Sequence, residues 1–490
     1  MIPLGLPRPG SPDEPVRGGS DPHRAGSERD VDITLDLLRR YDRPGPRYTS
    51  YPTAVEFTPG FTEKTYRAKL AEADSRSNEP LSLYLHLPFC AERCSYCGCN
   101  VVITKKSEVV AGYLSYLERE IDLIATHLPH RRRITQLHWG GGTPTYLDLA
   151  QMEALQRKIT EHFTFEPDAE VAVEVDPRVT SRAQIRLLSQ LGFNRISIGV
   201  QDFTPEVQSA INRNQTEAET RELYEYCREL GFGSINLDLI YGLPLQNPGT
   251  FARSMETVLD LRPDRVAVYS YAFVPWLKAH QKRMDVDALP TPRVKLHLFS
   301  IARSRLLTAG YVQIGMDHFA LPDDELVRAM NRGKLHRNFM GYTVTMGSDM
   351  IGAGTSAIGD VRGALAQNVK KLSSYYRALD AGKFPIERGR ERDKDDEIRR
   401  DVILQLMCNF TLDRKAIEER FGIDFDRYFA DELAELRAPD GAVQHDFLRI
   451  EPDRLEVVEH GRLFVRNICM VFDRYLRTKR NEAPVFSRTV

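Results

Sequence analysis

The chain lacks long apolar segments and an excess of charge of either sign. No apolar run in its 490 residues reaches the roughly 18 residues of a membrane span, and the amino terminus has no apolar signal-peptide core. The formal net charge is −2 with 28% charged residues, which gives no reason to expect nucleic acid or a membrane surface as partner. We therefore expect a cytoplasmic protein, in which clustered cysteines serve metal binding or catalysis rather than disulfides.

Cysteine is scarce, yet four of the seven cysteines fall in the segment FCAERCSYCGCN, residues 89–100. The other three stand alone in helical or apolar segments, where we expect small buried hydrophobic residues. A structural zinc site needs four ligands, typically from two C-x2-C knuckles, and the sequence has no second knuckle. The cluster therefore favours a different metal centre.

Three of the clustered cysteines, Cys90, Cys94 and Cys97, have the spacing C-x3-C-x2-C. Three thiolates from one loop favour an iron–sulfur cluster, and in a 4Fe-4S cluster they would leave one iron open to a substrate. Cys99 could complete the set, but we expect its side chain to point to the opposite side from that of Cys97. We therefore predict three ligands and one bystander.

Composition divides the chain into four parts. Residues 1–30 are rich in Pro, Gly, Arg and Asp, which predicts a disordered extension. Residues 31–80 are expected to form a short helix and a proline-rich connector. Strand patterns fill the next part and end near residue 365, so we predict a catalytic domain over 81–365 and a helical C-terminal domain over 366–490.

Six strand-like runs alternate with helical segments between residues 81 and 272. They are residues 81–87, 134–139, 169–175, 194–201, 234–241 and 264–272. This alternation predicts an α/β fold with a parallel sheet and right-handed crossovers. One face of these strands is apolar and the other partly polar, whereas a closed barrel and a doubly wound sheet would bury apolar residues on both. We predict an open partial (β/α)6 barrel; a complete barrel, with a seventh strand from 311–319, is the alternative.

Several motifs give the chain a resemblance to a known enzyme family. The three spaced cysteines, with Tyr96 before the last, resemble the signature of radical S-adenosylmethionine (SAM) enzymes. From about residue 31 onward, the blocks GPRYTSYPTA, LHWGGGTPTYL, VEVDPR, GVQDF, DLIYGLP, GMDHFALPDDEL, LHRNFMGYT and RNICMVFDRYLRTK follow one another. Together they resemble the oxygen-independent coproporphyrinogen III oxidase family of heme biosynthesis.

The resemblance implies a radical SAM partial barrel with one 4Fe-4S cluster on the three cysteines and two molecules of SAM. It assigns to the first, iron-bound SAM the residues Tyr84, Gly141, Glu174 and Ile358. It assigns to the second SAM the residues Tyr96, Gly142, Thr143, Gln201, Arg213, Asp238 and Ala272. Strand parity independently places Tyr84, Glu174, Gln201 and Asp238 on the polar face. Tyr84 and Glu174 are the protein groups expected nearest the chemistry, and the glycine run is expected to let backbone groups approach the cofactor.

The implied reaction converts two propionate side chains of coproporphyrinogen III to vinyl groups, giving protoporphyrinogen IX without molecular oxygen. It requires a reduced electron-donor protein such as flavodoxin, and we expect a monomer. Arg47, His336 and Arg337 are candidate partners for the propionates, and the connector around Tyr48 with the C-terminal domain is the candidate lid. Two alternatives remain open: a heme chaperone of the same superfamily, and a radical SAM enzyme of another substrate class such as a methyltransferase.

Overall fold

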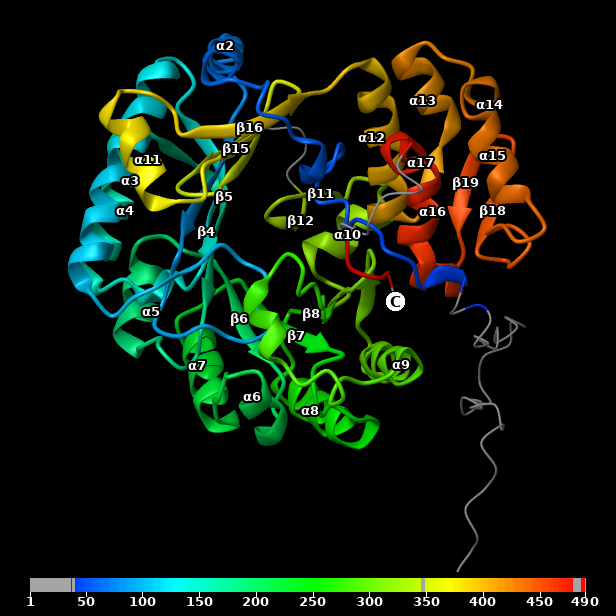
Figure 1. The fold of residues 1–490 in the computed structure, drawn as a ribbon, viewed down its shortest axis with the longest axis horizontal. Coiled ribbons are helices and arrows are strands. Elements are labelled where there is room, and N and C mark those ends of the chain that lie inside the picture. The colour runs from blue at the N-terminus through cyan, green and yellow to red at the C-terminus, as the bar shows by residue number, and fades with distance from the viewer. Residues whose placement is uncertain (1–36, 38–39, 345–348, 479–485, 490) are drawn as a thin grey trace, which may run out of the picture.

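The computed structural model describes residues 37, 40–344, 349–478 and 486–489. The disordered extension expected over 1–30, and most of the short helix expected near residues 33–41, lie outside the described residues. What is described forms an α/β part, on the left in Figure 1, and a mainly helical part made by the C-terminal segment, on the right.

Twelve strands form one curved sheet in the order β16-β15-β14-β13-β1-β4-β5-β6-β7-β8-β10-β9. The six predicted strands are its parallel centre: β1 (Leu81–Leu87), β4 (Arg133–Gly141), β5 (Thr164–Val175), β6 (Arg195–Gln201), β7 (Ser234–Tyr241) and β8 (Arg265–Ser270). β13 (Met350–Ala353) adds a further parallel strand beside β1. Among the described strands the two edges, β16 and β9, do not pair with each other, so the predicted open barrel is confirmed.

The alternative of a complete barrel is wrong. Residues 311–319 supply β9 (Val312–Ile314) and the start of β10 (His318–Ala320), which form an antiparallel hairpin, and β10 runs antiparallel to β8. The strand β10 lies between β8 and β9 in the sheet, so β9 does not pair with β8 as a parallel seventh strand. The hairpin therefore ends the sheet instead of closing it.

The strand pattern does not stop near residue 365. The strands β14 (Ile358–Val361), β15 (Ala364–Asn368) and β16 (Ile386–Glu391) extend the sheet by antiparallel pairing beyond β13. These strands are short, and residues 364–368 are buried at every position, so they show little of the alternation by which a strand is recognised.

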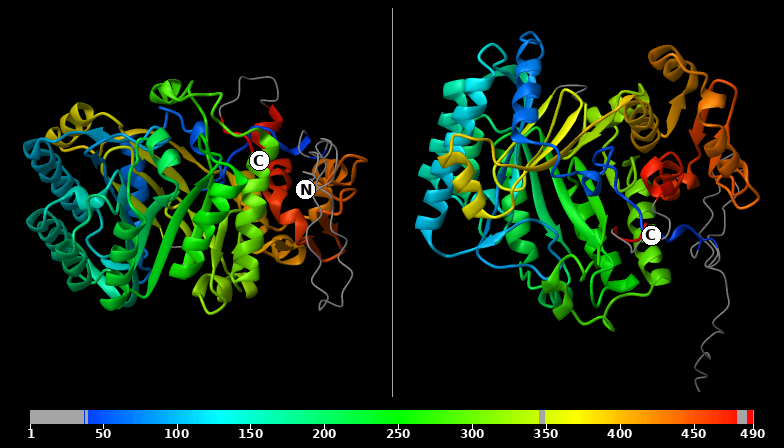
Figure 2. Two further views of the ribbon diagram at one scale, coloured as in Figure 1. Left: turned by 90° about the horizontal axis from the view of Figure 1, so that it is seen from below. Right: turned by 45° about the horizontal axis from the view of Figure 1, so that its top comes forward.

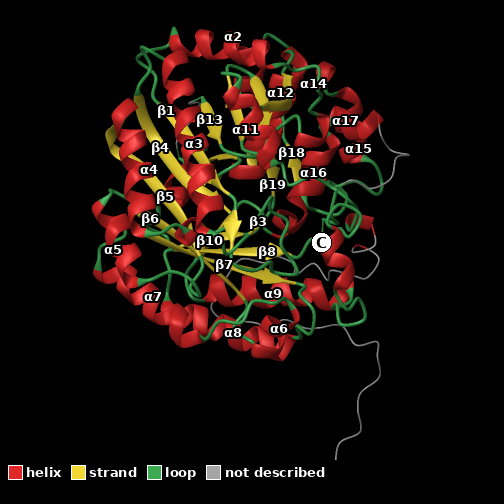
Figure 3. Ribbon diagram, turned by 60° about the vertical axis from the view of Figure 1, so that its left-hand side comes forward, coloured by secondary structure: helices red, strands yellow, loops and turns green. Residues whose placement is uncertain are grey.

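Helices cover the convex face of the sheet, as Figures 2 and 3 show. They are α2 (Glu63–Asp74), α3 (Ser107–His127), α4 (Leu149–His162), α5 (Arg182–Gln190), α6 (Pro205–Ala210), α7 (Glu217–Glu229), α8 (Pro248–Leu261), α9 (Pro292–Thr308) and α11 (Leu372–Asp380). Capping boxes start α4 at Asp148, α5 at Ser181, α7 at Thr216 and α8 at Asn247: each of these side chains accepts from the N–H of the third helical residue, whose own side chain accepts from the N-cap N–H. The apolar residues of β1 to β8 face these helices, which leaves their polar residues on the concave side.

The C-terminal part packs around its own core. It contains α12 (Lys394–Asn409), α13 (Arg414–Phe421), α14 (Phe425–Tyr428), α15 (Ala430–Arg437), α16 (Val465–Val471), α17 (Arg474–Thr478) and the small antiparallel sheet of β17 (Thr411–Asp413), β19 (Arg454–Val457) and β18 (Leu448–Ile450). Tyr48 and Tyr51 of the connector are buried in this core, which also takes residues from β9 and from α10 (Glu325–Asn331). Two short pairings, β2 (Phe89–Cys90) with β3 (Val102–Ile103) and β11 (His336–Asn338) with β12 (Gly341–Thr343), complete the described strands. No described helix combines the length and apolar character that crossing a membrane requires.

Candidate functional site

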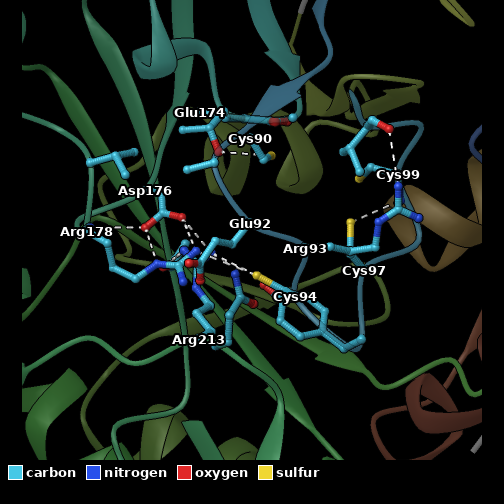
Figure 4. A pocket seen from close by; sticks show the side chains of 18 of the residues that line it. Cys90, Glu92, Arg93, Cys94, Cys97, Cys99, Glu174, Asp176, Arg178 and Arg213 are labelled. Carbon is cyan, nitrogen blue, oxygen red and sulfur yellow. Dashed lines mark hydrogen bonds and ion pairs between the residues drawn. The ribbon is translucent and has the colours of Figure 1, made fainter. Parts of the chain in front are cut away.

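A cavity of about 570 Å³ opens at the carboxyl ends of the parallel strands, where parallel α/β folds place their chemistry. Its walls come from the ends of β4, β5 and β6, from β7 and β8, and from the loop between β1 and β3. In Figure 4, Cys90 lies beside Glu174, Cys94 lies near Arg213 and Asp176, and Cys97 and Cys99 lie further along the loop. The cavity therefore joins thiols to carboxylates and guanidinium groups.

The cysteine loop is held by backbone hydrogen bonds on both sides. Val102 N–H donates to the carbonyl of Pro88 (2.7 Å), which closes the loop on itself, and Ser95 N–H donates to the carbonyl of Ile211 (2.8 Å). The side-chain amide of Asn212 also donates to the carbonyl of Arg93 (3.0 Å), and the backbone of Asn212 has φ of 52°. The loop thus has a fixed position although residues 91–100 contain no regular secondary structure.

The four clustered cysteines all line the cavity. The expectation that Cys99 points away from Cys97 is wrong: the Cys99 N–H donates to the Cys97 sulfur at 3.4 Å. Side chains two positions apart share a face even in an extended chain, and this segment turns at Ser95 and Tyr96 and bends at Cys99. A hydrogen bond from the Cys99 thiol lowers the pKa of Cys97. Cys99 is therefore a close neighbour of the predicted ligands.

The surroundings of the other thiols differ. Burial raises the pKa of Cys90 to about 11, while its sulfur lies 3.5 Å from the hydroxyl of Thr143. Guanidinium groups of Arg178 and Arg213 each donate to the Cys94 sulfur at 3.7 Å. The thiolate is the form of cysteine that binds metal. Three thiols on one wall of an open cavity fit the ligand set of an iron–sulfur cluster.

A single metal ion fits this geometry less well. Throughout the part of the chain that the structure describes, no three His, Cys, Asp or Glu side chains come close enough together to hold one ion. Ligands of one zinc ion must converge on a point, whereas those of a polynuclear cluster bind separate irons. The structure therefore does not support the alternative of structural zinc.

Glu174 lies at the end of β5 and faces the cavity. Its carboxylate accepts from the Gly141 N–H (3.1 Å) and lies 3.3 Å from His138 Nε2. Burial opposes ionisation, but the hydrogen bonds from His138 and Gly141 outweigh it and lower the pKa of Glu174. Tyr84 stacks on the His138 ring at 5.8 Å. Glu174 is thus a fixed, ionised acceptor.

The glycine run at the end of β4 is required by packing within the protein. Gly141 has φ of 116°, and a Cβ there would lie 2.5 Å from the ring of His86. A Cβ on Gly142 would lie 2.6 Å from the backbone of Pro88. The N–H of Gly142 donates to the carbonyl of Leu87 (2.8 Å). The glycines therefore bring β4 against the start of the cysteine loop, a reason that the sequence analysis did not foresee.

Asp176 joins two arginines on the far wall of the cavity. It pairs with Arg178 at 2.7 Å and with Arg213 at 2.9 Å, and Arg213 also donates to the carbonyl of Gly199 at 2.6 Å. In Figure 4 these side chains lie next to Cys94. Nε of Arg213 is buried without a partner among the described residues. Because a buried unpaired donor is costly, this nitrogen points to a missing ligand atom.

Asp238 and Gln201 lie on neighbouring strands of the same wall. Burial raises the pKa of Asp238 to about 6, although Asn236 (2.8 Å) and Ser197 (3.0 Å) donate to its carboxylate. Gln201 ends β6 at a break in register and has φ of 68°. Strained backbone of this kind is concentrated at functional sites.

Most predicted site residues meet at this cavity. Those that line it are Cys90, Cys94, Tyr96, Cys97, Gly141, Gly142, Thr143, Glu174, Gln201, Arg213 and Asp238. Three do not: Tyr84 reaches the site through His138, Ala272 accepts a hydrogen bond from Gln281 (3.2 Å), and Ile358 lies on β14.

The sequence analysis missed several residues that line the cavity. They include Asp176, Arg178, Ser197 and Tyr269. Asp176 and Arg178 belong to the block VEVDPR, which was recognised as a family motif, but only Glu174 of that block was given a role. Strand alternation places Ser197 and Tyr269 on the polar face, but it gave neither residue a role in the site.

Comparison with known proteins gives matches along nearly the whole chain. Residues 84–258 match the Radical SAM superfamily and residues 393–464 match the HemN C-terminal domain. The oxygen-independent coproporphyrinogen III oxidase of Pseudomonas aeruginosa is 46% identical over 460 residues, covering 93% of this chain and 98% of that protein. The Escherichia coli protein of the same name is 44% identical over 466 residues, covering 95% of this chain and 100% of its own length. The solved structure of coproporphyrinogen III oxidase (HemN) from Escherichia coli, described as a radical SAM enzyme, aligns with a TM-score of 0.86 at 43% identity, covering 91% of this chain and 100% of that one.

Proposed function

Because the chain belongs to the family of oxygen-independent coproporphyrinogen III oxidases, we propose how its own residues carry that reaction. The protein is a radical SAM oxidoreductase of heme biosynthesis that converts two propionates of coproporphyrinogen III to vinyl groups. Each propionate loses a hydrogen atom, an electron and carbon dioxide. When bound, the 4Fe-4S cluster and SAM supply the 5'-deoxyadenosyl radical that takes the hydrogen atom. The observation that carries this assignment is one cavity that joins the thiols to ionised polar groups.

Cys90, Cys94 and Cys97 would hold the cluster, which leaves one iron open to the first SAM. Glu174 would accept hydrogen bonds from the amine or the ribose of that SAM, since its carboxylate is ionised and faces the cavity. Tyr84 acts on this site by packing on His138, and is therefore a positioning residue. Gly141 lines the cavity and is a further contact in this proposal, whereas the family resemblance alone supports Ile358.

We place the second SAM against the far wall of the cavity. The unpaired Nε of Arg213 and the carboxylate of Asp238 offer a donor and an acceptor there. The side chain of Gln201 lies beside them, at a position where Gly199 leaves the room that a Cβ would fill. The remaining contacts in this proposal are Tyr96, Gly142, Thr143 and Ala272.

The substrate propionates need cationic partners near the cavity. Arg337 is buried, and its Nε and Nη1 have no partner among the described residues. Burial raises the pKa of Tyr269, which lines the cavity, and the nearby positive charge of Arg337 opposes that rise. Arg47 lies over the Tyr269 ring at 5.2 Å and pairs with Asp317. We propose Arg337 as the main carboxylate partner, because Arg47 already has a counter-ion, and we keep His336 as a weaker candidate.

The connector and the C-terminal part would seal the cavity, since a radical must be kept from solvent and from the protein. Tyr48 is buried and donates to Asp473 (3.0 Å), and the hydroxyl of Tyr51 accepts from the N–H of Arg474 (3.2 Å). These bonds tie the connector to the C-terminal part. Family membership supports the oxidase over the heme chaperone and over another substrate class. We also propose a cytoplasmic monomer that receives electrons from a protein such as flavodoxin.

The reaction is tested by anaerobic incubation of the reconstituted protein with SAM, dithionite and coproporphyrinogen III deuterated at the propionate β-carbons. We expect the label to appear in 5'-deoxyadenosine and protoporphyrinogen IX to form, both measured by mass spectrometry. Unlabelled 5'-deoxyadenosine formed with vinyl product would refute the hydrogen abstraction. Labelled 5'-deoxyadenosine without loss of carbon dioxide would refute the assigned substrate chemistry.

A further inference from the structure

A surface segment beside the cysteine loop carries an unusual share of exposed apolar side chains. Of the eight large hydrophobic residues exposed in the described part of the chain, three lie within residues 274–289: Trp276, Leu277 and Val286, at 54%, 57% and 58%. A fourth, Leu245, donates its backbone N–H to a carbonyl of the same segment at 2.8 Å. Exposed apolar groups gathered in one place mark interaction sites, whereas single ones do not.

The same segment contacts the chain that carries the predicted cluster ligands. His280 Nε2 lies 2.9 Å from the carbonyl oxygen of Cys97, and the Lys278 ammonium donates to the carbonyl of Cys99 at 3.4 Å. Gln281 donates to the carbonyl of the residue before Cys97 at 3.1 Å. A protein docked on this segment would therefore lie next to the cluster without entering the cavity.

The segments that contact the cysteine loop contain more basic than acidic residues. The three neighbouring segments 91–108, 274–289 and 370–371 contain eight Lys and Arg residues against four Asp and Glu, in a chain whose net charge is −2. Segment 370–371 belongs to this group because its Lys370 carbonyl accepts from the Asn100 amide at 3.3 Å. The cations are Arg93, Lys105, Lys106, Lys278, Lys282, Arg283, Lys370 and Lys371. The segments that contact the cysteine loop thus carry an excess of basic side chains, which we call the basic rim.

We propose that this surface, which we call the donor-docking surface, binds an acidic one-electron carrier protein. The inference rests on the proposed function, whose radical chemistry consumes one electron for each SAM cleaved. In each encounter the reduced carrier loses one electron and the cluster gains it. The basic rim would steer the carrier and set its orientation, while the apolar side chains give the small contact typical of transient redox complexes. The carrier need not displace SAM or substrate, because the residues of segments 274–289 and 370–371 do not line the cavity.

Binding is tested by anaerobic calorimetric titration of the reconstituted holoenzyme with oxidised flavodoxin at low and high salt. We expect Lys282→Glu with Arg283→Glu to weaken binding by about tenfold or more, and Trp276→Ser to weaken it at both salt concentrations. A matched control, Lys415→Glu with Arg427→Glu, reverses two exposed charges in the C-terminal part and should bind like the wild type. Equal affinities of all variants would overturn the proposal, as would undetectable binding by the wild type.

Electron delivery is tested by following reduction of the cluster and formation of 5'-deoxyadenosine with two reductants. With reduced flavodoxin, the variants Lys282→Glu/Arg283→Glu and Trp276→Ser should be slower by about tenfold. With dithionite, which needs no docking surface, they should match the wild type within about twofold. Loss with both reductants would overturn the docking proposal. Wild-type protein that reduces with dithionite but makes no vinyl product would instead refute the proposed function.

Discussion

Two buried arginines lie at opposite ends of the barrel and differ in what they contact. Arg131, fully buried at the amino-terminal ends of the strands, donates from Nε to the Glu79 carbonyl (2.8 Å) and from Nη2 to the Pro80 carbonyl (3.1 Å). Its Nη1 donates to the Ala73 carbonyl and to the Asp349 carboxylate. Every nitrogen of this guanidinium is satisfied, and the contacts tie the chain before β1, β4 and β13 together.

Arg213, at the carboxyl-terminal ends, is 6% exposed and keeps one nitrogen without a partner in the described residues. Its other contacts are Asp176, Gly199 and the sulfur of Cys94. A fully satisfied buried charge serves stability, whereas a partly satisfied one beside a cavity is a binding group. The amino-terminal end of the barrel therefore stabilises the fold, whereas the carboxyl-terminal end has polar groups available to bind ligands.

The largest expected effect removes a thiol at the cavity end. Cys90→Ala, Cys94→Ala or Cys97→Ala should abolish the cluster and all activity, because three thiolates leave no spare ligand. Cys99→Ala should keep the cluster. Iron and sulfide content per chain, with the visible spectrum, measures both. If Cys99→Ala loses iron as completely as Cys97→Ala, the three-ligand assignment is wrong.

The next effect should fall on stability. Arg131→Met leaves the buried Asp349 carboxylate without its main cation and removes the guanidinium donors from three carbonyls, so we expect a loss of about 3–5 kcal/mol in the free energy of unfolding. Urea unfolding of the apoprotein measures this loss. Variant protein that still folds should keep its affinity for SAM. Unchanged stability would show that the amino-terminal end does not depend on this residue.

The matching substitution at the carboxyl-terminal end of the barrel, Arg213→Gln, should lower the affinity for SAM more than the stability of the fold. Arg213→Gln should weaken SAM binding by about 10- to 100-fold, the value of a lost charged hydrogen bond of about 1.5–3 kcal/mol. The unfolding free energy should change less than in Arg131→Met, because Asp176 keeps its pair with Arg178. Equilibrium binding of SAM and urea unfolding measure the two quantities. A larger loss of stability than of affinity would break the comparison.

The smallest effect concerns Asp238 and pH. Its pKa in the folded protein is about 6, above the ordinary value of 3.8, because burial penalises the charged carboxylate. A raised pKa means that folding favours the protonated form, so the contribution of Asp238 to stability is lost as pH rises through about 6. The unfolding free energy of Asp238→Asn minus that of the wild type should therefore increase by on the order of 1–3 kcal/mol from pH 4 to pH 7. A difference between the two proteins that is constant with pH would contradict this.

Much of the fold could be predicted because its signals are local. Four of the central strands, β1, β5, β6 and β7, alternate apolar and polar residues, and that alternation also gave the direction of Glu174 and Asp238. The strands after β13 escaped prediction since they are short and their burial comes from the neighbouring strands. The hairpin at 311–319 was recognised as strand, but its antiparallel pairing with β8 depends on contacts far apart in the chain.

The sequence by itself determined the spacing of the thiols, the class of the fold and the family, because cysteine spacing, strand parity and ordered motifs are written along the chain. The tertiary structure alone decided that Asp176, Arg178 and Arg213 meet beside Cys94, that Cys99 shares the cavity, and that the glycines of β4 accommodate His86 and Pro88. These contacts join residues from separate strands and loops. Their geometry follows from how the sheet curves and packs, which no local pattern records.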